Sequence, residues 1–203
     1  MSMPTPNQIK DANQEFWRWI FREDDNSDHP LKRTNNRTAQ IQRDSLLIVA
    51  GSLPDNMQRN RLLQILSGIE YVFVPAENCV YTEADNDGQT DQVLIDKANQ
   101  DMLDSRARVL VNNVQQPINR LPGHTFSPPL DIQKCISGTG KSGRGEGCMS
   151  GGPPGPTRAA AACDYAIIRA NTLRSGDTIK IEGVGRAAPN QVRGRIDVTY
   201  RVQ

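Results

Sequence analysis

The sequence lacks the features that would place it in several large classes of protein. Its 203 residues include 24 Lys and Arg against 23 Asp and Glu, whereas a surface that binds nucleic acid normally needs a basic excess. No apolar run approaches the roughly 20 residues that span a bilayer. Residues 1–14 lack the charged and then apolar layout of a signal peptide. We therefore expect no nucleic-acid partner and no membrane span, and the compartment stays open.

Cysteine is sparse, and its spacing argues against a zinc site. The four cysteines form no Cys-x-x-Cys pair and lie far in sequence from both histidines, so a structural zinc site has little support. An even count fits two disulfides as well as four free thiols. The pairing that we favour is Cys135 with Cys148, which closes a ring of 14 residues and is worth about 3 kcal/mol on a chain-entropy model. Cys79 and Cys163, next to predicted strands, are the remaining pair.

Two segments have the apolar periodicity of amphipathic helices. Residues 5–22 begin with Thr5, Pro6 and Gln8, which supply a capping box and a proline at the first helical position. Helical spacing then produces one apolar stripe, made of Ile9, Ala12, Phe16, Trp19 and Ile20. A second helix is predicted over residues 90–105, with an inner side made of Val93, Leu94, Ala98, Met102 and Leu103.

The remaining predicted elements are strands. Residues 45–50 form a continuous apolar run, as expected for a strand buried on both faces, and residues 69–74 form a strand that we expect Pro75 to end. Residues 61–66 fit a strand and a helix equally. Residues 196–202 alternate between apolar and polar side chains, which predicts a strand with one wet face. Shorter strands are predicted at residues 108–111, 114–118, 165–169 and 178–182, with turns at Asn112-Asn113 and at residues 173–177.

This pattern predicts the fold class. Several short strands with turn signals and only two helices indicate a mainly β protein, an antiparallel β-sandwich or jelly-roll with an N-terminal amphipathic helix and one further helix. The length suits one domain over residues 1–203. Residues 23–44 are expected to form an irregular polar segment.

Five segments also occur in a familiar order: EFWRWIF, SLLIVAGSL, IEYVFVPAEN, CDYAIIRANTLRSGDTIKIEGVG and IDVTYRV. This order resembles a family of small, often secreted microbial β-sandwich domains with a tryptophan-rich first helix, a strand ending in Ala-Gly and a closing strand pair around a glycine turn. The chain lacks the aromatic residue and the cysteines that the family tends to have around LLIVAGS. The family has no characterised function, so the resemblance implies the fold, favours an extracellular or cell-surface location and supplies no catalytic residues.

Residues 137–156 form a glycine- and proline-rich stretch with eight of the 16 glycines. Gly140, Lys141 and Ser142 match the end of a phosphate-binding P-loop, but Cys135 stands where the first glycine of that motif belongs. Glycine and proline also oppose the helix that must follow a P-loop. We therefore expect a surface loop between two strands and no bound nucleotide. If Cys135 and Cys148 are bonded, Lys141, Arg144 and Glu146 lie at the tip of this loop.

An acidic stretch before the second helix is the one candidate metal site. Glu83, Asp85 and Asp87 stand at alternate positions before Gly88, like the first half of an EF-hand loop. The twelfth position is Leu94 instead of a bidentate Glu, which excludes an EF-hand. A looser Ca²⁺ site is one interpretation. The other, which we favour, is an acidic turn whose charges stabilise the N-terminus of the following helix.

The first helix carries a second aromatic face. Trp17 and Phe21 lie outside the apolar stripe and are four residues apart, so they stack on one side of the helix. Either the chain itself covers this face, for example with residues 23–44, or another subunit does, since exposed aromatic patches mark interfaces. The interface interpretation makes Trp17 and Phe21 contact residues in an assembly.

No residue pattern assigns a reaction. His29 and His124 stand next to turn residues and lie in no recognisable nucleophile motif. We expect a non-enzymatic structural or interaction module, at a cell surface or within a larger assembly, with a protein partner or self-assembly. The alternative is a carbohydrate- or small-ligand-binding domain assisted by Ca²⁺, and the third is a hydrolase with a site in its loops. A ligand binder should expose several aromatics, and many of the ten present stand at core-like positions.

Overall fold

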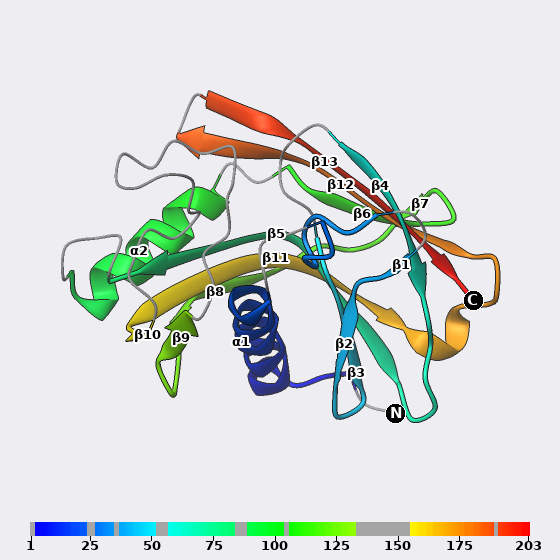
Figure 1. The fold of residues 1–203 in the computed structure, drawn as a ribbon, viewed down its shortest axis with the longest axis horizontal. Coiled ribbons are helices and arrows are strands. Elements are labelled where there is room, and N and C mark those ends of the chain that lie inside the picture. The colour runs from blue at the N-terminus through cyan, green and yellow to red at the C-terminus, as the bar shows by residue number, and fades with distance from the viewer. Residues whose placement is uncertain are drawn as a thin grey trace.

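The computed structural model describes residues 3–23, 27–34, 37–51, 57–83, 89–103, 106–132, 155–188 and 191–203. More of these residues lie in strands than in helices, as predicted (Figure 1). In chain order the elements are α1 (Pro6–Arg22), β1 (Arg37–Thr38), β2 (Gln40–Arg43), β3 (Leu46–Val49), β4 (Gln58–Leu63), β5 (Tyr71–Thr82), α2 (Asp91–Met102), β6 (Arg108–Val111), β7 (Val114–Gln115), β8 (Asn119–Thr125), β9 (Leu130–Ile132), β10 (Gly155–Thr157), β11 (Ala159–Arg169), the 3-10 helix η1 (Ala170–Thr172), β12 (Thr178–Ala188) and β13 (Gln191–Val202).

The strands form two main sheets. The six-stranded sheet has the order β1-β4-β13-β12-β6-β7, the five-stranded sheet has the order β2-β3-β5-β11-β8, and β9 pairs separately with β10. In Figure 1 the six-stranded sheet lies above the long strands β5 and β11, and α1 lies below them. The prediction of a mainly β protein with two α-helices is confirmed.

The sheets are mixed, which corrects the prediction that they are antiparallel. β1 runs parallel to β4, β4 to β13, and β3 to β5. The parallel pair of β3 and β5 arises because the chain crosses to the other sheet between them and forms β4 there. A crossover of this kind returns the chain in the same direction, and no local sequence pattern indicates it. Residues 23–44, expected to be irregular, supply β1 and β2.

Side-chain hydrogen bonds cap helix α1 at both ends. The Thr5 hydroxyl accepts from the Gln8 amide at 3.3 Å, and the Gln8 side chain accepts from the Thr5 amide at 2.8 Å, which confirms the predicted capping box. At the other end, Nδ1 of His29 accepts from the Leu31 amide at 3.2 Å. Nε2 of His29 therefore carries the proton and donates to the Ile20 carbonyl at 3.0 Å, which satisfies one of the last carbonyls of the helix.

The predicted strands are present, and four of them, β5, β11, β12 and β13, are longer than expected. All four residues of β3 are buried, so the apolar run is confirmed as a strand covered on both faces. β5 continues through Pro75, where we expected an end, because Pro75 lies at a bulge in the pairing with β11 and its missing N–H is tolerated there. The Asn112-Asn113 turn has the predicted positive φ angles of 48° and 66°.

β11 begins six residues earlier than predicted, in the alanine run at residues 159–162. Ala159, Ala161 and Cys163 belong to the main apolar core, while Ala162 packs in a separate cluster with Ala98 of α2. The strand is therefore covered on both faces, and small side chains let these neighbours approach it closely.

A buried polar network joins the two sheets. The Arg61 side chain is 1% exposed, and its Nε donates to the Arg33 carbonyl at 2.7 Å while Nη1 donates to the Ala50 and Gly51 carbonyls at 2.9 and 2.8 Å. Nη1 also donates to the Tyr200 hydroxyl at 3.0 Å. Since Arg61 lies in β4 and Ala50 follows β3, this Arg61 network ties the end of β3 to the six-stranded sheet.

Candidate functional site

Helix α2 and helix α1 lie on opposite faces of the five-stranded sheet. Asn78 and Cys79 are successive residues of β5 and so point to opposite faces. The Asn78 side chain accepts from Trp17 Nε1 of α1 at 2.9 Å, and Cys79 Sγ donates to the Ala98 carbonyl of α2 at 3.3 Å. Figure 1 shows the two helices on either side of β5 and β11. The contacts between α2 and the sheet include several hydrogen bonds made by side chains.

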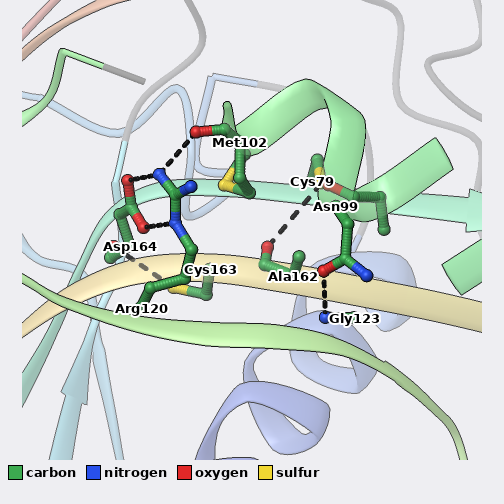
Figure 2. Close-up of polar contacts among 9 residues, drawn as sticks. Cys79, Asn99, Met102, Arg120, Gly123, Ala162, Cys163 and Asp164 are labelled. Carbon is green, nitrogen blue, oxygen red and sulfur yellow. Dashed lines mark hydrogen bonds and ion pairs between the residues drawn. The ribbon is translucent and has the colours of Figure 1, made fainter. Parts of the chain in front are cut away.

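An ion pair lies at the C-terminal end of α2 (Figure 2). Arg120 of β8 donates to both carboxylate oxygens of Asp164 of β11, from Nε at 2.8 Å and from Nη2 at 2.9 Å. Nη2 also donates to the Met102 carbonyl of α2 at 2.5 Å. The Asp164 residue is 5% exposed, and the hydrogen bonds to it raise the pKa of the Arg120 guanidinium above its ordinary value. A guanidinium engaged in this way acts as a structural contact between two strands and the helix.

Two further contacts hold α2 against β8 and β5. The Asn99 side chain accepts from the Gly123 amide at 2.6 Å (Figure 2), and the Tyr81 hydroxyl donates to the Asp101 carboxylate at 2.6 Å. A Cβ at Gly123 would lie 2.7 Å from the Ile95 carbonyl oxygen. Glycine is therefore required at this position for α2 to approach β8 so closely. We call these contacts, with the Arg120–Asp164 pair, the α2 polar cluster.

The two described cysteines have no nucleophilic character. Burial raises the pKa of the Cys79 thiol well above its ordinary value, and the nearby charge of Asp101 raises it further. Burial, followed by the charge of Asp164, likewise raises the pKa of Cys163. Because the thiolate is the reactive form of cysteine, both side chains stay protonated and unreactive in the folded protein.

The predicted Cys79–Cys163 disulfide is wrong. Both residues are free cysteines. Although β5 and β11 are neighbours, Cys79 lies opposite Ala162 and Cys163 lies opposite Asn78. The two sulfurs therefore point to opposite faces of the sheet, and no rotamer can join them. Cys135 and Cys148, the favoured pair, lie outside the described residues, so their disulfide stays a prediction.

Glu83, the first residue of the predicted Ca²⁺ site, is held by an arginine. Arg158 donates to both of its carboxylate oxygens, at 2.9 and 2.6 Å, and this hydrogen bonding lowers the pKa of Glu83. Asp85 and Asp87 lie outside the described residues. Within the described ranges, no group of three or more His, Cys, Asp and Glu residues is placed to hold a metal ion.

Trp17 and Phe21 are buried by their own chain, which corrects the interpretation that they contact another subunit. They are 3% and 1% exposed, and their rings stack at 5.6 Å between centroids. The hydrogen bond from Trp17 to Asn78 shows that β5 covers this face of α1. The sequence could not show this because the strand that covers it lies 61 residues away.

The glycine-rich stretch connects two strands that pair with each other. Residues 133–154 lie outside the described residues, including Gly140, Lys141 and Ser142. β9 precedes them and the antiparallel β10 follows, with Ile132 opposite Gly155. The loop was predicted over residues 137–156, whereas Gly155 and Pro156 already belong to β10. The absence of a nucleotide stays a prediction.

His124 lies in β8, the edge strand of the five-stranded sheet, next to Thr125, whose carbonyl accepts from Gln14 of α1. Its Nδ1 lies 3.1 Å from the Pro122 carbonyl, and its ring stacks on Phe126 with 6.3 Å between centroids. Burial lowers the pKa of His124, so the neutral ring is favoured. His29 is engaged at the C-terminal end of α1.

Comparisons of the chain with protein-family models, with curated proteins and with solved structures find no match. The resemblance to secreted β-sandwich domains therefore stays a prediction. Neither helix among the residues described is long and apolar enough to cross a membrane.

Proposed function

We propose that this protein is a non-enzymatic interaction module that assembles through a projecting pair of strands. β12 pairs with β6 only as far as Glu182, and β13 pairs with β4 only from Asp197. Beyond these points residues 183–188 and 191–196 pair only with each other among the described strands, and Figure 1 shows both strands running past the ends of β4 and β6. We call this two-stranded ribbon the β12–β13 arm.

The arm supports the proposal because the backbone N–H and C=O groups on both of its outer edges are not paired with another described strand. An unpaired strand edge is a template to which another chain can add a strand. Two copies of the same arm can pair edge to edge about a two-fold axis, which is the commonest symmetry of protein assemblies. A second copy of this chain is therefore the partner that we propose.

The aromatic residues favour this proposal over a carbohydrate-binding domain. All ten lie in the described part of the chain, and none is exposed. Only Tyr81 and Tyr165 are half-buried, and they pack against core residues. A sugar-binding face usually offers aromatic rings to the ligand, and the rings of this chain serve its own core instead.

The polar groups that could support catalysis are engaged in structural contacts. Arg120 and Asp164 join two strands to α2, His29 caps α1, and the two described thiols are protonated. A nucleophile needs a base within hydrogen-bonding distance and a lowered pKa, which neither thiol has. These contacts support a structural role over the hydrolase alternative.

The test compares the mass of the native protein with that of a variant with a shortened arm. Residues 184–195 are replaced by Asn-Gly, which suits a two-residue turn. We expect the wild type to exceed the 22.5 kDa of one chain in light scattering, and the shortened variant to stay folded by circular dichroism and to have the mass of one chain. As a control, Val114→Ser at the exposed tip of another hairpin should leave the mass unchanged. A wild type that is monomeric at high concentration contradicts the proposal.

A further inference from the structure

Helix α2 is attached to the molecule by a small apolar surface. Its buried residues are Leu94, Ala98 and Met102, spaced along one face, whereas α1 buries nine residues. Ala98 and Met102 pack with Ala162 in an apolar cluster that is separate from the main core. A helix held by so few apolar contacts is a candidate for the least stable unit of a fold.

When α2 separates from the sheet, water can replace the hydrogen-bond partners that its polar groups lose, at a small cost in free energy. When the helix leaves, the Arg120–Asp164 pair stays intact because both residues belong to the sheet. The bonds that are lost include the one from Arg120 to the Met102 carbonyl and those of Asn99 and Asp101. The bond from Cys79 to the Ala98 carbonyl and the ion pair of Asp91 with the exposed Arg158 are lost as well. Since Arg120 and Asp101 are exposed to solvent, water can take the place of these partners.

The sheet beneath α2 keeps its own packing when the helix leaves. Ala161 and Cys163 of β11 face the main core on the side of α1, whereas the separate apolar cluster under α2 is made of Ala98, Met102 and Ala162. The backbone pairing of β11 with β5 and β8 also does not involve α2. Loss of α2 therefore leaves the rest of the fold in place.

We propose that α2 opens as a unit while both sheets stay folded, and that this opening uncovers the face of the five-stranded sheet that carries Cys79, Tyr81 and Ala162. This inference is independent of the proposed assembly through the β12–β13 arm. The open state is a minor one that exists in equilibrium with the closed structure.

Hydrogen exchange in the full chain at increasing concentrations of urea tests the proposal. We expect the α2 amides to exchange through an opening with a shallow dependence on urea, because little surface is exposed, and the β11 and β13 amides to follow global unfolding with a steep dependence. Met102→Ala should raise the exchange rate of the α2 amides by more than about tenfold. Leu103→Ala, at an adjacent side chain that is 64% exposed, should leave it unchanged.

A substitution far from α2 separates local opening from global unfolding. Val198 is fully buried in β13, so Val198→Ala should speed exchange in β11 and β13 by more than about tenfold. The α2 amides should keep their wild-type rate, because the open state retains the contacts of Val198. If Val198→Ala instead speeds exchange in α2 equally, or if α2 and β13 share one urea dependence, α2 opens only when the whole protein unfolds and the proposal is wrong.

The reactivity of the two described cysteines gives a second measurement of opening, because Cys79 and Cys163 point to opposite faces of the same sheet. With Cys135 and Cys148 replaced by serine, a bulky maleimide should modify Cys79 at a rate that follows exchange in α2. Cys163, in the main core, should react only at the rate of global unfolding. Equal rates at the two sulfurs in this double-serine variant contradict the proposal.

Discussion

The buried Arg61 network offers the sharpest test of how the two sheets are joined. In the variant Arg61→Met the side chain keeps much of its apolar volume and loses all of its donors. The Ala50 carbonyl keeps a donor, because the Tyr200 hydroxyl lies 2.8 Å away. The carbonyls of Arg33 and Gly51 lose the donor that Arg61 supplies.

These contacts allow the loss of stability to be estimated. Two partly buried carbonyls without a partner cost about 1–2 kcal/mol each, or about 3 kcal/mol together. One effect opposes this: Nη2 of Arg61 is buried and has no hydrogen-bond partner among the described residues, so its removal restores about 1 kcal/mol. We therefore expect Arg61→Met to lower the free energy of unfolding by about 2 kcal/mol. Tyr200→Phe should cost about 1 kcal/mol, since the Ala39 carbonyl still accepts from the Ala50 amide at 2.9 Å.

Urea unfolding followed by circular dichroism measures these changes as shifts of the midpoint at constant slope. The control is Arg201→Met, at an exposed arginine of β13, which should change stability by less than about 0.5 kcal/mol. A double-mutant cycle between Arg61 and Tyr200 should give a coupling of about 1 kcal/mol, because the two side chains share a hydrogen bond. If Arg61→Met is as stable as the wild type, the network does not hold β3 to the six-stranded sheet, and our reasoning is refuted.

Three further predictions concern α2, β8 and pH. Gly123→Ala should destabilise the protein by about 1–3 kcal/mol in urea unfolding, because its Cβ would lie 2.7 Å from the Ile95 carbonyl oxygen; an unchanged midpoint would show that α2 shifts freely. Arg120→Ala should lower the free energy of unfolding by about 2–3 kcal/mol, because it leaves Asp164 buried without its cation. Arg120→Lys should restore only part of this stability, and full restoration by lysine would contradict the role of the paired hydrogen bonds. Burial lowers the pKa of His124 below its ordinary 6.5, so the unfolded chain takes up this proton at a higher pH than the folded protein does. The contribution of His124 to stability should therefore be complete above pH 6.5 and fall as the pH drops below it. Thermal unfolding of His124→Gln should depend less on pH in this range, and a pH profile equal to that of the wild type would exclude His124 as the cause of the dependence.

The sequence was most informative where a structure depends on neighbouring residues. The capping box of α1 involves residues three positions apart, and the Asn112-Asn113 turn needs only its own backbone angles. Both were predictable because a local pattern determines them. The strand at β3 was likewise predictable from a run of apolar residues, since burial on both faces leaves no polar position.

The features that the sequence did not predict depend on contacts between segments far apart in the chain. The alanine run of β11 has a high intrinsic preference for helix, and it forms a strand because β5 and β8 pair with it and α2 packs on it. Arg120 and Asp164 are separated by 44 residues, and nothing local to either residue indicates the other. The candidate site could not be predicted for this reason, and the face to which each cysteine points depends on a register that only the pairing of strands determines.

The pairing of β9 with β10 also makes this fold a convenient host for inserted sequence. Ile132 and Gly155 face each other as partners in an antiparallel pair, so their Cα atoms lie about 5 Å apart. Whatever joins them has to bridge only this short gap, and the entropy of closing a connection rises slowly with its length. A fluorescent protein or an affinity tag with adjacent termini could replace residues 133–154 without separating the two strands, which would turn this position into a site for reporting on the protein in cells.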